Sequence, residues 1–142
     1  MSWLQNTNVF LEQHKNHATL GDVASQVDKA KLVLADVTMN FVSQAKQDPQ
    51  LVIIGATPYL RMFGHVEVAN VLLEQAVLAA DKLSERVKGV VTPEILRGDP
   101  EARFYDQKVK TARFFASTVL PEAIALGKAI KAGDRSALDI VF

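Results

Sequence analysis

Apolar residues recur at alternating spacings of four and three between Asp22 and Gln47, and this periodicity constrains the fold more than any other feature of the sequence. The stripe consists of Val23, Val27, Ala30, Leu34, Val37, Phe41 and Ala45. Such spacing places the side chains on one face of an α-helix. The opposite face is polar and carries Asp28, Lys31, Asp36, Asn40 and Gln44. The pattern predicts a bundle helix with one solvated side, whose first free amides are capped by Asp22.

A second helical pattern extends from Pro58 to about Lys88 and is apolar around most of its circumference. One face contains Leu60, Phe63, Val66 or Glu67, Val71, Gln75, Leu78 and Leu83. A helix of this kind belongs in the middle of a domain, because neighbours must cover more than one of its sides. The preceding stretch, "QLVIIGATP", is predicted to be a short separate segment that ends at Gly55, with a new helix start at Thr57-Pro58.

The last long helix is expected between Pro100 and Ala132. It starts well, because Asp99 can cap it and a proline suits the first turn. Pro121 removes one internal hydrogen bond and predicts a kink. Gly133 follows at the position of a left-handed cap. The apolar stripe of this helix comprises Phe104, Val109, Ala112, Phe115, Val119, Ala123, Leu126 and Ile130.

A less regular N-terminal segment, with Trp3, Leu4, Phe10 and Leu11, is expected to add a short helix. No strand pattern emerges along the chain. We therefore predict an all-α fold, an up-and-down helical bundle of three long helices plus one or two short ones. Residues 1–20 are interpreted as an N-terminal helical segment or the remnant of a preceding region, and residues 21–142 as the bundle domain.

Composition excludes several classes of protein. The 142 residues include 16 basic and 16 acidic side chains and no cysteine. A chain without net charge has no overall field that would attract nucleic acid or an anionic membrane, and without cysteine it has neither disulfides nor thiolate metal sites. No apolar run approaches the roughly 18 residues of a membrane span, and no export signal is recognised. We expect a cytoplasmic protein that binds no nucleic acid and does not span a membrane.

The histidines are the first candidates for chemistry. His65, with Arg61 one turn away, invites a phosphotransfer interpretation, but "RMFGHVEVA" lacks the Lys-Gly spacing that follows such a histidine. A hydrogen-bonded structural histidine is favoured. In "EQHKNH", Glu12, His14 and His17 lie close together, yet a carboxylate-bridged metal site needs Glu-x-x-His pairs on two helices and the chain has none. We predict solvated surface there and no metal site.

Other sequence features also favour packing over catalysis. No nucleophile elbow or phosphate-binding loop is present. The segment "ARFYDQKVKTARFFA" mixes basic and aromatic residues, but Phe104 and Phe115 at helical spacing are interpreted as core. Gly64 lies within a long helix, where glycine costs about 1 kcal/mol relative to alanine. It is therefore expected to mark a tight helix crossing.

Three segments in a fixed order resemble a known family. They are "TPYLRMFGHVEVANVLLEQAVLAA", then "FYDQKVKTARFFASTVLPEAIAL", and a tail that ends "SALDIVF". Together they resemble the C-terminal helical domain of bacterial acyl-CoA dehydrogenases, the acetyl-CoA dehydrogenase C-terminal-like module, in the group that includes the 3-methylmercaptopropionyl-CoA dehydrogenases. The resemblance covers residues 21–142.

The resemblance implies a flavoprotein parent that oxidises acyl-CoA to 2-enoyl-CoA. In such an enzyme a glutamate removes the α-proton of the acyl thioester while FAD takes the β-hydride. The base, the FAD site and the thioester pocket belong to a catalytic core that precedes this domain. No catalytic or cofactor-binding residue is therefore assigned to this chain, and the isolated chain is predicted to be colourless and inactive.

What the resemblance does assign to the chain is a packing role against the catalytic core, which would help to set the dimer arrangement of a homo-oligomer. Tyr59, Arg61, Phe104 and Tyr105 are the candidate interface residues, because they lie at helix starts. Alternatively, these side chains close the ends of the bundle's own core. A docking face without its partner would be apolar and exposed, and would cause self-association. The alternative function is a free-standing helical-bundle interaction or regulatory module.

Overall fold

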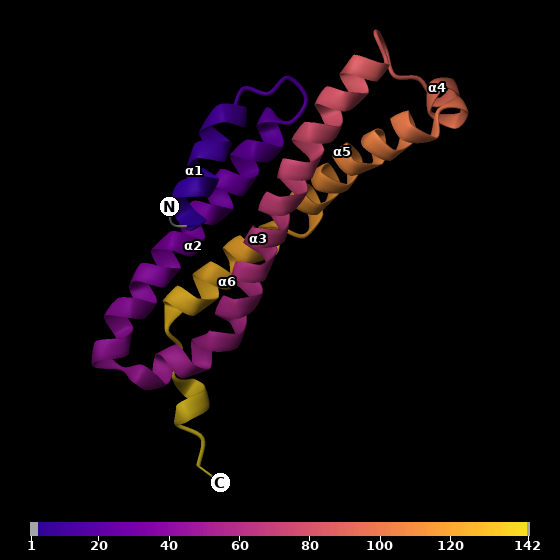
Figure 1. Cartoon of the computed structure of the whole chain (residues 1–142). Coiled ribbons are helices and arrows are strands. Elements are labelled where there is room, and N and C mark those ends of the chain that lie inside the picture. Colours follow the sequence, from indigo (N-terminus) through magenta and orange to yellow (C-terminus); the bar gives the residue numbers. More distant parts are fainter. Residues whose placement is uncertain (1–2, 142) are drawn as a thin grey trace.

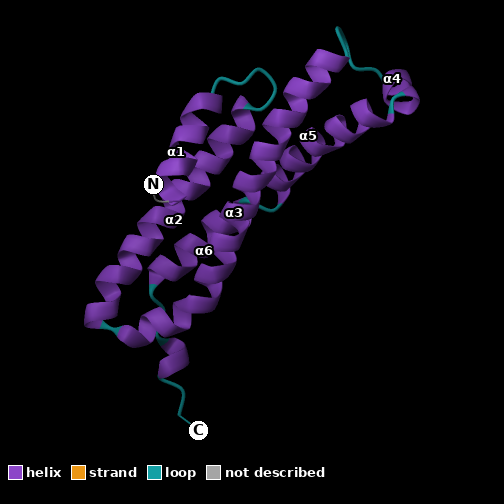
Figure 2. Cartoon of the chain, viewed as in Figure 1, coloured by secondary structure: helices purple, strands orange, loops and turns teal. Residues whose placement is uncertain are grey.

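The computed structural model describes residues 3–141 as an elongated bundle of helices (Figure 1). The elements are α1 (Trp3–His14), α2 (Gly21–Gln47), α3 (Pro49–Arg86), α4 (Pro93–Gly98), α5 (Pro100–Thr118), α6 (Pro121–Ala132) and a short 3-10 turn, Ser136–Leu138. No strand occurs in the described part of the chain (Figure 2). The all-α prediction is confirmed. The side chains of Trp3 and Leu4, which the sequence suggested as N-terminal packing residues, lie outside what the structure describes.

Helix α3, with 38 residues, is the spine of the bundle. The chain passes up α1, down α2, up α3 and down again through α5 and α6 (Figure 1). The first half of α3 packs against α2 and α6, and its second half packs chiefly against α5. The predicted up-and-down order and the central position of the second long helix are both confirmed.

The core consists of small and medium apolar side chains where these helices meet. From α2 and α3 it contains Val23, Val27, Ala30, Leu34, Val37, Met62, Val66, Ala69, Leu73 and Ala76, and α5 and α6 add Val109, Ala112, Ala123 and Ile130. The predicted stripe of α2 is therefore correct over most of its length. Towards the end of α2, Phe41 is half-buried and Ala45 is exposed.

Lys31 was expected on the solvated face of α2 and is instead buried, with 4% of its surface exposed. Helix α1 packs over this part of α2. The Lys31 ammonium donates to Asn8 Oδ1 and to Asp28 Oδ1, each at 2.5 Å. A buried cation is tolerated because both of these acceptors reach it. The covering helix comes from a segment whose periodicity is weak, so the pattern of α2 alone could not show it.

The start of α2 also differs from the expectation. Asp22 does not cap the helix, and its carboxylate instead accepts from Arg113 Nη1 of α5 at 2.8 Å. The start of α2 has no side-chain cap, and the imidazole of His17 instead supports the turn before it, where its Nδ1 accepts from the backbone amides of Thr19 and Leu20, each at 3.2 Å. His17 thus satisfies amides at the turn that leads into α2.

The two internal prolines behave differently from the prediction. Helix α3 runs without interruption through Gly55 and Pro58, so the expected break before Pro58 is wrong. At Pro121 the predicted kink is a full break, and α5 and α6 are separate helices joined by Val119 and Leu120. At the break, the amides of Val119 and Leu120 both donate to the carbonyl of Phe115, which closes α5 before the proline. The predicted end of the last helix at Ala132 is confirmed, with Gly133 left-handed at φ +63°.

The expected tight crossing at Gly64 is wrong within this chain. A methyl group built on Gly64 would meet no atom within 4 Å. The close approaches lie at two other glycines. A methyl group at Gly55 would lie 2.6 Å from Phe41 Cζ, and one at Gly127 would lie 2.8 Å from Val33 Cγ1. These two positions bring α3 and α6 close to α2.

None of the helices among residues 3–141 combines the length and the apolar character needed to cross a lipid bilayer.

Candidate interface on helices α3 and α5

Several apolar residues of α3 that the sequence had grouped on one face are exposed. Leu60 and Leu78 are 71% and 62% exposed, and Val71 lies between them with 39% of its surface exposed. The core of the bundle is formed by the intervening residues, such as Met62, Val66 and Leu73. The grouping of Leu60, Val71 and Leu78 on one face is correct, but this face points away from the core, and Val66, which was offered as a member of the same face, lies in the core instead.

A groove of about 470 Å³ adjoins this face, where α3 and α5 lie side by side. It is lined by Gln75, Leu78, Ala79 and Lys82 of α3 and by Phe104, Tyr105 and Lys108 of α5. These residues lie close because α5 runs antiparallel to α3, so the first two turns of α5 face the later turns of α3.

Phe104 and Tyr105, two of the predicted interface residues, contribute differently to the groove. Phe104 is 53% exposed, so its interpretation as core is wrong. The half-buried Tyr105 packs against the core and donates to Glu101 Oε1 at 2.7 Å, and this hydrogen bond raises the pKa of the Tyr105 phenol. The two rings meet edge to face with centroids 5.8 Å apart. The exposed ring of Phe104 thus contacts the half-buried ring of Tyr105.

The cations of the groove were not recognised as site residues in the sequence. Lys108 donates to Gln75 Oε1 at 2.9 Å and lies over the Phe104 ring, 5.5 Å from its centroid. Lys82, on the α3 side, makes no ion pair or hydrogen bond within the described residues. No acidic side chain lines the groove. The only available signal was the mixture of basic and aromatic residues in the first turns of α5.

Tyr59 and Arg61, the other two candidates, make contacts inside the bundle. The Tyr59 hydroxyl lies 2.8 Å from Thr38 Oγ1, and its ring lies 5.0 Å from that of Phe41, so it packs on α2. The Arg61 guanidinium pairs with Glu122 Oε1 at 2.5 Å and so joins α3 to α6. The structure therefore brings Phe104 and Tyr105 together but places Tyr59 and Arg61 at separate helix contacts.

The histidines are engaged in structural hydrogen bonds. His65 Nε2 lies 3.1 Å from Glu122 Oε2, and the imidazole edge contacts the ring of Phe115. His65 thus makes a hydrogen bond between α3 and α6, the kind of contact that the sequence favoured for it.

The cluster Glu12, His14 and His17 is also divided among other contacts. Glu12 pairs with Lys15, His14 Nδ1 donates to the carbonyl of Phe10 at 2.8 Å, and His17 accepts from backbone amides of the turn before α2. Nowhere in the described residues do three or more metal-binding side chains come together.

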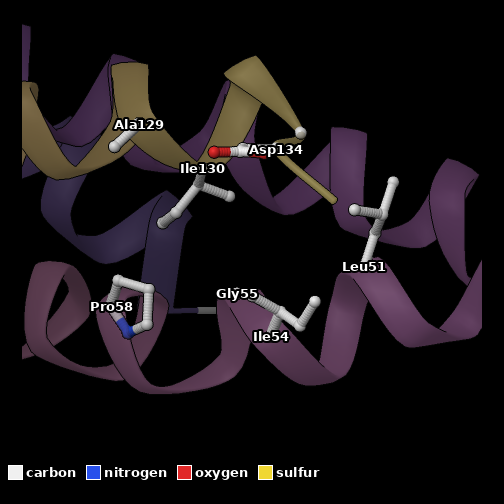
Figure 3. Close-up of a pocket in the computed structure, with 8 residues that line it drawn as sticks. Leu51, Ile54, Gly55, Pro58, Ala129, Ile130 and Asp134 are labelled. Carbon is white, nitrogen blue, oxygen red and sulfur yellow. The ribbon is translucent and has the colours of Figure 1, made fainter. Parts of the chain in front are cut away.

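A smaller pocket lies at the other end of the bundle, between the first turns of α3 and the end of α6 (Figure 3). Leu51, Ile54, Pro58 and Ile130 supply most of its wall, and Asp134 lies at its edge. Its volume is about 150 Å³, whereas pockets that bind small ligands usually measure about 300–1,000 Å³. The pocket does not fit a flavin or a coenzyme A thioester.

Asp134, at the edge of this pocket, makes a hydrogen bond within its own turn. Its carboxylate accepts from the backbone amide of Ser136 at 2.8 Å. Hydrogen bonds from Ser136 lower the pKa of the Asp134 carboxyl. The residue thus fixes the turn that follows α6.

Comparison with known proteins gives consistent matches over nearly the whole chain. The profile of the family described as acetyl-CoA dehydrogenase C-terminal like matches residues 3–141. A butyryl-CoA dehydrogenase of Syntrophomonas wolfei subsp. wolfei (strain DSM 2245B / Goettingen) is 30% identical over 138 residues, which cover 97% of this chain and 21% of that protein. A second butyryl-CoA dehydrogenase of the same strain is 27% identical over 139 residues, which cover 96% of this chain and 21% of that protein.

The chain thus spans about a fifth of the length of these curated relatives. No solved structure matches the chain.

Proposed function

Because the chain belongs to the acetyl-CoA dehydrogenase C-terminal-like family, we propose that it is the C-terminal helical domain of an FAD-dependent acyl-CoA dehydrogenase and that its own role is to pack against the catalytic region. The observation that carries this proposal is the family match over residues 3–141, together with relatives in which the matched part is only about a fifth of the protein. The exposed apolar face of α3 and the adjoining groove agree with a packing role.

In this proposal the enzyme oxidises acyl-CoA to 2-enoyl-CoA, and the chemistry resides in the catalytic region. The flavin accepts the hydride there when it is bound. The side chains of this chain supply neither the base nor the thioester pocket, because in this proposal both belong to the catalytic region. The domain's contribution is to pack on the catalytic region and to help set the subunit arrangement of a homo-oligomeric, dimeric enzyme in the cytoplasm.

The acyl substrate is a narrower question within the same proposal. The two relatives are named butyryl-CoA dehydrogenases, which favours a short acyl chain. The resemblance of the sequence motifs to the 3-methylmercaptopropionyl-CoA dehydrogenases also favours a short acyl thioester. Rates with butyryl-CoA and with 3-methylmercaptopropionyl-CoA would separate the two.

The test compares the 142-residue chain with the longer polypeptide in which it follows a catalytic region. The longer protein should bind flavin and reduce an artificial electron acceptor with acyl-CoA, whereas the chain alone should be colourless and inactive. Deleting the domain should lower the melting temperature or change the oligomeric state of the longer protein. A chain that binds flavin and turns over acyl-CoA alone would overturn the proposal. A gene that encodes only these residues, with no dehydrogenase that binds the product, would favour the free-standing interaction module.

A further inference from the structure

The bare face of α3 has the spacing of a helix–helix seam. Leu60, Gly64, Val71 and Leu78 follow one another at intervals of four, seven and seven residues. Residues at such intervals lie along one side of a helix, and seams between long helices use this repeat. The stripe is about 27 Å long at 1.5 Å per residue. Its length suits another helix better than a loop or a small ligand.

Gly64 lies within this stripe, and no contact within the chain explains why a glycine is present there. Unlike Gly55 and Gly127, which touch α2 side chains, it faces open space. A glycine in the middle of a helix costs about 0.5–1 kcal/mol relative to alanine. The missing side chain leaves room for the close approach of a second helix.

The charges at one end of the stripe indicate what that helix must carry. Lys82 and Lys108 border the groove between α3 and α5, and Leu78 and Phe104 form its apolar part. Glu85 and Glu101 lie with Lys82 around the adjoining pocket, but Lys82 forms no ion pair with either of them within the described residues. A carboxylate from outside would therefore complement the two lysines on the groove side.

We propose that this docking face, made of Leu60, Gly64, Val71, Leu78, Lys82, Phe104 and Lys108, receives an amphipathic helix of the enzyme's catalytic region. The contacting side of that helix is apolar and carries an acidic residue that meets Lys82. The inference rests on the proposed function and names the face and the chemistry of the partner, which the family relationship does not.

A second copy of the chain fits the same face less well. A twofold axis that covers the whole stripe passes near Ala69, and it would place Leu60 of each copy against Leu78 of the other. The same axis would set Glu67 against Val71 and Glu74 against Gly64, whereas a helix of a different sequence can place polar or basic side chains opposite these two carboxylates. It would also leave Lys82 without an acidic partner.

The experiment uses the absence of cysteine from the chain. Leu78→Cys is introduced on the docking face, and Met39→Cys, at a residue 69% exposed on α2, is the control. The rate of modification by a thiol reagent is measured at each position by peptide mass spectrometry, in the 142-residue chain and in the longer enzyme. We expect modification of position 78 to slow at least about tenfold in the enzyme, because a docked helix covers it, and that of position 39 to stay unchanged.

A second pair of variants tests the charge. In the enzyme, Lys82→Glu should raise the rate of modification at position 78 at least about threefold, since like charges weaken docking. Lys29→Glu, on α2, should have no effect. Circular dichroism melts of each variant of the isolated chain show that it folds.

Several results would overturn the inference while leaving the proposed function intact. Equal reactivity of position 78 in the chain and in the active enzyme would show that the face stays open. Protection of position 39 alone would place the contact on α2. Protection of position 78 that grows with the concentration of the isolated chain would identify a second copy as the occupant. If position 78 stayed equally protected in the Lys82→Glu variant, the docked helix would carry no acidic residue opposite Lys82. Failure of the proposed function would appear separately, as a longer protein without dehydrogenase activity.

Discussion

His65 Nε2 on α3 lies 3.1 Å from Glu122 Oε2, at the second residue of α6. The other oxygen of the same carboxylate pairs with Arg61, one turn before His65. One acidic side chain thus ties two positions of α3 to the first turn of α6, directly after the break at Pro121. A carboxylate in the first turn also complements the positive end of the helix dipole. His65, which looked most like a reacting group in the sequence, thus helps to direct α6 back onto the bundle.

Replacing Glu122 with glutamine should lower the free energy of unfolding by about 0.5–1 kcal/mol. The change keeps the shape but removes the charge that both Arg61 and His65 approach, and the group is only half-buried, so the effect stays modest. Urea titration at neutral pH measures it. The control is Glu94→Gln, whose partner Arg97 is as exposed as Glu94 itself, at about three-quarters for each side chain. Equal losses in the two variants would contradict the proposed role of Glu122.

Lys31 offers a test of how α1 is held. Lys31→Ala removes both the buried stem and the ammonium that bonds to Asn8 and Asp28, and should cost about 2 kcal/mol. Lys31→Met keeps the stem, and the carboxylate of Asp28 is half exposed, so this variant should lie within about 1 kcal/mol of the wild type. Denaturant titration gives both values, and faster hydrogen exchange in residues 3–14 should accompany the alanine variant. If methionine proves as damaging as alanine, the hydrogen bond from Lys31 to Asn8 rather than the packing of the Lys31 stem holds α1.

The helices that follow one regular pattern could be predicted from the sequence, and the exceptions depend on distant contacts. The stripe of α2 is correct because period and burial agree within a single segment. The two internal prolines give similar local signals, yet the helix continues through Pro58 and breaks at Pro121. The first proline lies in a segment that packs against Phe41 at Gly55, and the second is preceded by Leu120, which is buried with its chain turned at the break. No local rule distinguishes these cases.

The candidate interface shows the same division. The sequence correctly grouped Leu60, Val71 and Leu78, because helical spacing alone determines a shared face. It could not show that this face is bare, because the core side of α3 is decided by where α2, α5 and α6 pack. Phe104 looked like core for the same reason. Lys82 became a candidate only when the groove between two antiparallel helices was seen.

The glycines of the bundle should respond in opposite directions to alanine. Gly55→Ala should lower the free energy of unfolding by about 1 kcal/mol, since an added methyl group 2.6 Å from Phe41 Cζ forces the ring to move and overpacking costs about 1–3 kcal/mol. Gly64→Ala meets open space and should raise the free energy of unfolding by about 0.5–1 kcal/mol through helix propensity. Both are measured in the isolated chain by urea titration. A loss of stability in Gly64→Ala would show that its environment is not open.

The loss of stability at acid pH should depend on Asp99, which caps α5 and pairs with Arg86 of α3. The Arg86 guanidinium, at 2.5 Å, and the amides of Ala102 and Glu101 lower the pKa of the Asp99 carboxyl. A carboxyl whose pKa is lower in the folded state stabilises the protein above the unfolded pKa of about 3.9, and this stabilisation is lost as the pH falls through the folded value. Asp99→Asn can still cap the helix but lacks the charge, so it should melt at a lower temperature than the wild type at pH 7. The difference should shrink as the pH falls below about 4, because the unfolded chain binds a proton at this carboxyl there, whereas the folded protein binds it only at a lower pH. Thermal melts from pH 3 to pH 7 test this, with the exposed Asp139→Asn as the control that should follow the wild type. A difference that stayed constant or widened towards pH 3 would show that the charge of Asp99 does not stabilise the junction between α3 and α5.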